Sequence, residues 1–138
     1  MNKRVAGYSK RPLVDKLGIK PGAAIAILNA PTGYDRILGR LPSQVTRKAT
    51  AARPLDVIQF FTKDRRELER KFAGLARALA PAGMLWISWP KQASGVATDL
   101  TEDVIRAVGL GRGWVDVKVA AVDDVWSGLK FVRRLENR

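Results

Sequence analysis

The chain of 138 residues contains no cysteine and no histidine. Without cysteine it forms no disulfide, no iron–sulfur cluster and no thiolate zinc site. Without histidine it lacks the commonest general base near neutral pH and the commonest metal ligand, so a Ser–His–Asp triad is excluded. Any catalysis therefore depends on carboxylates, lysines, tyrosines, hydroxyl groups or positioning, and we expect no metal site.

Long apolar runs are also missing. No stretch approaches the ~20 residues that a membrane-spanning helix needs. The basic N-terminus, residues 1–8, lacks the apolar centre of a signal peptide. A hydrophobic content of 46% is that of a folded chain. We therefore expect one cytoplasmic domain over residues 1–138, with a loose basic arm at 1–11 and no membrane contact.

Positive charge is plentiful and unevenly spread. The net charge is +12, and residues 1–55 carry 11 Lys or Arg against 2 acids. Such a field attracts phosphates, nucleic acid or acidic proteins, although it also serves solubility alone. The densest basic patch, the candidate for polyanion contact, consists of Lys10, Arg11, Lys16 and Lys20.

Apolar runs alternate with amphipathic ones along the chain. We predict strands at 23–28, 55–61, 84–89, 115–122 and 129–133, a short edge strand at 45–47, and helices at 13–17, 34–41, 64–79 and 101–108. Asp64 and Glu67 match a capping box at the start of the third helix. Strands alternating with helices indicate a mostly parallel sheet, and the short connection at 123–128 indicates a final antiparallel hairpin.

The second half resembles class I S-adenosylmethionine-dependent methyltransferases. The phrase formed by Leu79, Pro81, Gly83, Leu85 and Ile87 is typical of a helix-to-strand turn in that family, and residues 101–133 resemble its final helix and hairpin. The resemblance implies a three-layer Rossmann-like α/β fold with a truncated methyltransferase-type sheet. The whole chain also resembles a group of short bacterial proteins that share a domain of unknown function, through segments such as 8–13, 86–91 and 126–131.

Two features depart from the methyltransferase pattern. The family's glycine-rich turn after the first strand is replaced by residues 29–34, which hold one proline and one glycine. The acid that normally ends the second strand and holds the cofactor ribose is replaced by Arg47 and Lys48. We therefore expect no cofactor, with S-adenosylmethionine as the alternative.

Ligands of open α/β sheets bind beyond the carboxyl ends of the strands. The candidate ligand-binding residues at that edge are Asn29, Pro31, Thr32, Gly33, Tyr34, Lys63, Trp89, Lys91 and Ser94. Each has a structural alternative. The loop at 29–34 also suits a plain turn, and Trp89 also suits packing against Trp86 or Trp126.

Other charged groups have plainer interpretations. Asp99, Glu102 and Asp103 suit helix capping better than metal binding or acid catalysis. The mixed charges at 65–71 indicate a solvated helix face.

The favoured hypothesis is a non-catalytic Rossmann-like domain that binds an anionic ligand or an acidic partner. The alternatives are a degenerate or short S-adenosylmethionine-dependent methyltransferase and a nucleic-acid-binding module that uses the basic N-terminal part.

Overall fold

The computed structural model describes residues 11–138. Along the chain the elements are α1 (Leu13–Leu17), β1 (Ala24–Leu28), α2 (Tyr34–Leu38), β2 (Thr46–Lys48), β3 (Leu55–Phe61), α3 (Arg65–Arg77), β4 (Leu79–Pro90), the 3-10 turn η1 (Gln92–Ser94), α4 (Glu102–Leu110), β5 (Trp114–Ala121), β6 (Trp126–Arg133) and the 3-10 turn η2 (Leu135–Asn137). No helix among these residues is long and apolar enough to cross a membrane.

The strands form one sheet in the order β2-β1-β3-β4-β6-β5. β1 pairs in parallel with β2 and β3, and β3 pairs in parallel with β4. β6 runs antiparallel to both β4 and β5. The predicted α/β fold, mostly parallel with a C-terminal antiparallel hairpin, is therefore confirmed, and the first three long strands point the same way.

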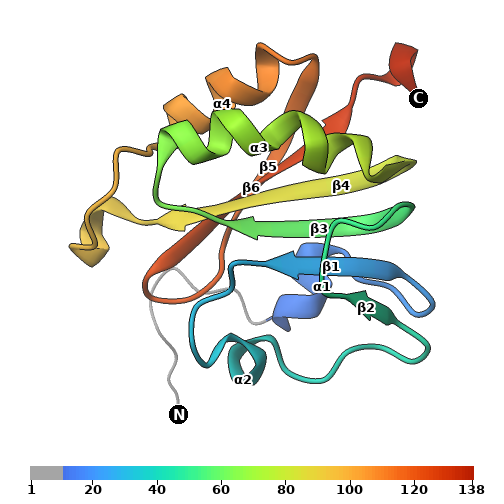
Figure 1. Cartoon of the computed structure of the whole chain (residues 1–138). Helices are drawn as coiled ribbons and strands as arrows, with labels where there is room; N and C mark the ends of the chain where they lie inside the picture. Colours follow the sequence, from blue (N-terminus) through green and yellow to red (C-terminus); the bar gives the residue numbers. More distant parts are fainter. Residues whose placement is uncertain (1–10) are drawn as a thin grey trace.

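Helices cover both faces of the sheet (Figure 1). α3 and α4 cover one face, where they enclose a large apolar cluster with strand residues such as Ile58, Phe60 and Phe131. The one-turn helices α1 and α2 cover part of the other face, where they pack on Val57, Phe61 and others. Alternate residues of β3 thus point into different cores, as the pleat of a strand dictates.

The start of α3 is fixed by polar side chains. The Asp64 carboxylate accepts hydrogen bonds from the backbone N–H groups of Arg66 and Glu67, which confirms Asp64 as the N-cap. The capping box closes differently from the prediction, because Glu67 accepts from the Thr62 hydroxyl at 2.6 Å, while the same hydroxyl accepts from the Asp64 N–H at 3.2 Å. Thr62 therefore mediates the link between the two acids.

The end of α3 also differs from the prediction. The helix ends at Arg77, and Leu79 already pairs with Leu55 as the first residue of β4. The residues between Leu79 and Met84 form an irregularity in this pairing. A Cβ on Gly83 would lie 2.9 Å from Leu79 Cδ2 and 3.0 Å from the Leu55 carbonyl oxygen, so a side chain here would force its neighbours to shift.

The ends of two further helices move. α2 ends at Leu38 because Gly39 adopts φ 80°, which stops the predicted continuation to residue 41. α4 continues past Gly109 to Leu110. Gly109 is instead a packing position, since a Cβ there would lie 2.1 Å from the Phe131 ring.

The connection from β2 to β3 contains no helix. Residues 49–54 run from the end of β2 across β1 to the start of β3, on the same face as α3 (Figure 1). Ala51 in this segment packs against the core on that face. Parallel strands are usually joined by a crossover of a dozen or more residues with its own helix. On the α3 face, β1 is therefore covered only by this short segment and not by a helix.

Candidate ligand-binding groove

The order of the strands reverses between β1 and β3. From β1 the chain goes outward to β2 and then returns to β3 on the other side. In open α/β sheets the crevice at such a switch point, beyond the carboxyl ends of the strands, is where ligands bind. β1 ends at Leu28 and β3 at Phe61, so this edge holds the loop after Leu28 and the start of α3.

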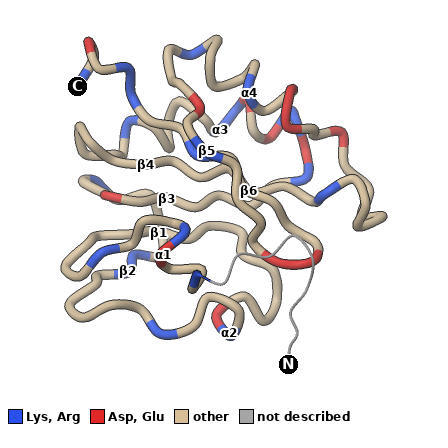
Figure 2. Tube along the Cα trace, turned by 180° about the vertical axis from the view of Figure 1, so that it is seen from behind, with Lys and Arg blue, Asp and Glu red and all other residues tan. Residues whose placement is uncertain are grey.

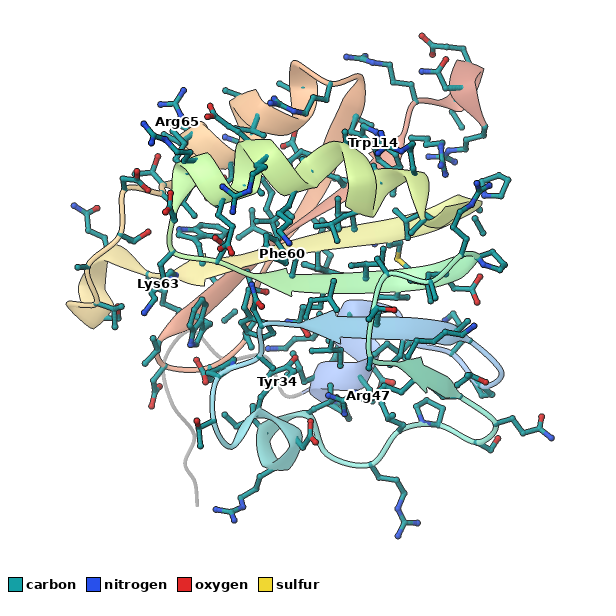
Figure 3. The ribbon with its side chains drawn as sticks, in the orientation of Figure 1. Tyr34, Arg47, Phe60, Lys63, Arg65 and Trp114 are labelled. Atoms are coloured by element: carbon teal, nitrogen blue, oxygen red, sulfur yellow. The ribbon has the colours of Figure 1, made fainter. Side chains whose placement is uncertain are left out.

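A groove of about 500 Å³ lies at this switch point. α3 forms one wall, residues 49–51 of the short crossover form the other, and Leu28 and Phe60 contribute to the floor. Figure 3 shows Phe60 between α3 and the sheet. A volume of this size is typical of small-molecule sites. The groove occupies the place that a crossover helix would otherwise fill.

The polar groups of the groove are mainly basic. α3 contributes Arg70, Lys71 and Arg77, against one acid, Glu67. Glu67 already accepts the hydrogen bond from Thr62, so part of its charge is engaged. At the open end, Asn29 and Thr50 contribute an amide and a hydroxyl. The groove therefore combines an apolar floor with a cationic wall.

The loop after β1 faces two hollows. Asn29, with φ 58°, turns the chain out of β1 and lines the groove. Pro31, Gly33 and Tyr34 line a separate hollow of about 260 Å³, together with Asp35 and Arg47. Arg47 forms an ion pair of 2.9 Å with Asp35. Thr32 is exposed in the same loop. Ligand contact by this loop stays a prediction.

Tyr34 lies in the core with 1% of its surface exposed. Its hydroxyl donates to Gln59 Oε1 at 2.5 Å, and Gln59 Nε2 donates to Ser88 Oγ at 3.1 Å. Burial raises the pKa of Tyr34 well above its ordinary value, so the phenol stays neutral. The side chain therefore anchors α2 to β3, and ligand contact by Tyr34 stays a prediction.

The loop after β4 closes over the start of α3. Thr98 Oγ1 donates to the Lys63 carbonyl oxygen at 2.6 Å, and Asp99 accepts from the Arg65 N–H at 2.8 Å. Asp99 is thus a capping residue, as expected, although it caps α3. With Asp64 it places two carboxylates at this helix end, which leaves no place there for an anion. Glu102 and Asp103 pair with Arg106, and the described residues hold no group of acids fit for a metal.

The remaining candidates on β4 and its loop have local roles. Trp89 is 6% exposed and belongs to the core under α3 and α4, on the opposite face from Trp86 and Trp126. Ser94 Oγ donates to the Lys91 carbonyl oxygen at 2.7 Å. The Lys91 N–H donates to the Val125 carbonyl oxygen at 2.7 Å. Lys63, Trp89, Lys91 and Ser94 therefore do not line the groove.

The predicted basic patch is only partly described, because Lys10 lies outside residues 11–138. Arg11 donates to the Asp15 carbonyl oxygen at 3.0 Å, and Lys16 Nζ donates to the Ala121 carbonyl oxygen at 3.2 Å. Lys20 is exposed and lines a hollow near Gly18. Arg11 and Lys16 thus lie on the face of the sheet opposite the groove.

Two sets of residues were not singled out from the sequence as ligand contacts. Arg70 and Lys71 lie in the mixed-charge stretch that indicates a solvated helix face, although their spacing along α3 places them on one side with Gly74 and Arg77. Thr50 lies in the crossover, which has no periodic pattern to mark it. The sequence does contain one indication of the groove, which is the short crossover between β2 and β3. A crossover without a helix leaves part of the sheet uncovered.

Solved structures of other proteins share the fold of this chain, whereas searches by sequence find no relative. No model of a known protein family and no curated protein matches this chain. Solved structures that match include magnesium protoporphyrin IX methyltransferase from Synechocystis PCC 6803 with bound S-adenosylmethionine, at 14% identity and a TM-score of 0.59 over 88% of this chain and 74% of that chain. A methyltransferase from Aquifex aeolicus matches at 13% identity and a TM-score of 0.61 over 86% of both chains.

A third match is ribosomal protein L11 methylase from Lactobacillus delbrueckii subsp. bulgaricus, at 13% identity and a TM-score of 0.59 over 88% of this chain and 75% of that chain. The resemblance to methyltransferases is thus confirmed as a likeness of fold. The fold and the switch-point groove define a Rossmann-like α/β domain of the methyltransferase type. At these identities, the likeness shows the fold alone.

Proposed function

We propose that this chain is a ligand-binding domain that holds a phosphate-bearing nucleotide in the groove between α3 and the crossover. The observation that carries the proposal is the charge of this groove, in which Arg70, Lys71 and Arg77 face one partly engaged acid at the switch point of the sheet. Lysine and arginine bind phosphate oxygens through charge-assisted hydrogen bonds. Leu28 and Phe60 offer the apolar floor on which a nucleobase packs.

The second candidate is S-adenosylmethionine-dependent methyl transfer. The solved structures with this fold favour it, since one magnesium protoporphyrin IX methyltransferase holds S-adenosylmethionine and the same enzyme also appears with S-adenosylhomocysteine. The size and place of the groove fit such a ligand. Its charges do not, because Arg70 and Lys71 repel a sulfonium cation. The end of β2 and the segment after it, residues 48–52, contain no carboxylate for the ribose.

A calorimetric titration with adenosine triphosphate, S-adenosylmethionine and S-adenosylhomocysteine separates the two candidates. We expect adenosine triphosphate to bind most tightly. Replacing Arg70 and Lys71 together by Gln removes two charge-assisted contacts and is expected to weaken its binding by about tenfold or more. Arg66→Gln is the matched control, because it removes a cation from α3 outside the groove.

The outcomes are distinct. Tighter binding of S-adenosylmethionine than of adenosine triphosphate would favour the methyltransferase candidate. Unchanged binding of adenosine triphosphate in the Arg70→Gln, Lys71→Gln variant, or no binding of any of the three compounds, would reject the groove as a nucleotide site.

A further inference from the structure

We propose that the face of the sheet opposite the groove carries a second site, a lysine strip that binds the phosphate backbone of a nucleic acid strand. The lysine strip consists of Lys16 on α1, Lys91 after β4, Lys118 on β5 and Lys130 on β6. It lies on a different face from the nucleotide groove and does not depend on that proposal.

The centre of the lysine strip is a pair of like charges. Lys118 and Lys130 are directly opposite each other in the antiparallel β5–β6 pair, next to a register shift between Asp116 and Lys118. Side chains opposite each other in such a pair lie about 5 Å apart at Cβ, and like charges there destabilise the sheet. Lys130 Nζ lies 5.8 Å from the centre of the Trp86 ring, on the α1 side. The like charges therefore cost stability, and of the two lysines Lys130 regains part of it through its contact with the Trp86 ring.

Two more lysines extend the charge toward the β5–β6 turn. Lys16 Nζ reaches the Ala121 carbonyl oxygen at the end of β5, and the backbone of Lys91 is bonded to Val125 in the turn. From Lys130 back to Val125 is five residues, or roughly 17 Å of extended chain. A single phosphate covers only a small part of such a row, whereas a chain of phosphates follows it.

The cations on this face influence one another. Burial, then Lys118, Arg11 and Lys91, lower the pKa of Lys16. Burial and Lys118 lower the pKa of Lys130. Bound phosphates relieve such repulsion, because an opposite charge favours the protonated amine. The acids close by are Asp15 on α1 and those in the turn (Figure 2), where Asp123 accepts hydrogen bonds from two backbone N–H groups.

An aromatic side chain favours nucleic acid over an acidic peptide. Trp126, half-buried at the turn end of β6, packs edge-on against Phe61 with ring centres 5.1 Å apart. Proteins that bind single strands combine a row of cations with aromatic rings on which bases stack. The lysine strip and Trp126 together form this combination on one face.

The test is fluorescence anisotropy of the full chain with short labelled single strands of RNA and of DNA, at about 50 and 200 mM salt. We expect binding that weakens steeply with salt. Lys118→Gln with Lys130→Gln should reduce the slope of log affinity against log salt by about 1.4, at about 0.7 for each lost phosphate contact, and affinity by about tenfold. The Arg53→Gln, Arg66→Gln variant loses the same charge at two exposed residues outside the groove and outside the lysine strip, and should bind normally.

Lys118→Gln alone removes the Lys118–Lys130 repulsion and keeps the Lys130 contact with Trp86, so this single variant should leave the thermal unfolding temperature equal or higher while still weakening binding. The proposal is overturned if neither RNA nor DNA binds, or if the two double variants weaken binding equally. It is also overturned if polyglutamate of equal charge displaces the strands as well as unlabelled RNA does, since the site would then accept any polyanion. Stronger binding of RNA or of DNA identifies which backbone the site prefers.

Discussion

The two faces of the sheet are held by different forces. On the α3 and α4 face, two long helices bury an apolar cluster in which Phe72 makes edge-on contacts with Trp114 and Phe131. On the α1 and α2 face, two one-turn helices are tied down by buried hydrogen bonds, such as that from Trp86 Nε1 to the Leu17 carbonyl oxygen at 2.9 Å. Long helices supply area, whereas short ones need specific polar contacts.

This difference explains where the two proposed sites lie. α3 covers its face apart from β1, where the helix-free crossover leaves a groove. The short α1 leaves β5 and β6 partly open on the other face, where Lys118 and Lys130 are only half-buried. In each case the site is found where a covering helix is short or missing.

Loss of apolar area on the α3 and α4 face should have the largest effect. Phe72 is fully buried, so Phe72→Ala should lower the free energy of unfolding by about 3–5 kcal/mol. Urea unfolding monitored by tryptophan fluorescence measures it. Ile37→Ala on α2, where the side chain is 44% exposed, is the control and should change stability by less than about 0.5 kcal/mol. Equal effects of the two changes would contradict the contrast between the faces.

Loss of a buried hydrogen bond on the α1 and α2 face should have an intermediate effect. Tyr34→Phe keeps the ring packed on Phe61 but removes the hydroxyl that donates to Gln59 Oε1. Gln59 is 1% exposed, so no water replaces this donor. The expected loss in the free energy of unfolding is about 1–3 kcal/mol. A loss below about 0.5 kcal/mol in the same urea assay would show that this face does not depend on the polar chain.

The smallest effect is expected at the α4–β5 contact and depends on pH. Arg106 donates to Asp116 at 2.8 Å and holds the pKa of that carboxyl below its ordinary value of 3.8. A lowered pKa stabilises the folded chain above about pH 4, and this stabilisation is lost as pH falls through the folded value. Asp116→Asn should therefore reduce stability at pH 7 and flatten its dependence on pH below about 4. The measurement is urea unfolding at a series of pH values. If the free energy of unfolding of Asp116→Asn fell below about pH 4 as steeply as that of the original chain, the result would contradict this prediction.

Local patterns in the sequence predict much of the fold. β3 has the predicted bounds because a mainly apolar run, interrupted by Asp56 and Gln59, lies between Pro54 and Thr62. The N-cap at Asp64 and the helix α1 follow from equally local signals. The end of α3 at Arg77 does not, because Leu79 continues the apolar stripe of the helix and only its pairing with Leu55 draws it into β4.

The candidate site is less accessible to sequence reasoning. The loop after β1 was expected at the ligand edge, and Asn29 lines the groove there. The cationic wall lines a groove only because the crossover from β2 to β3 has no helix to cover β1. The Lys118–Lys130 pair depends on a register shift in β5. Both are properties of tertiary pairing, which no periodicity within one segment encodes.

Localisation of a bound nucleotide tests the central claim most directly. Backbone amide shifts of the full chain are followed by nuclear magnetic resonance during titration with adenosine triphosphate. The account predicts that the largest shifts occur at Asn29, Thr50 and Gly74, which line the groove from three segments. Shifts confined to β5 and β6, or no shifts at saturating ligand, would contradict it.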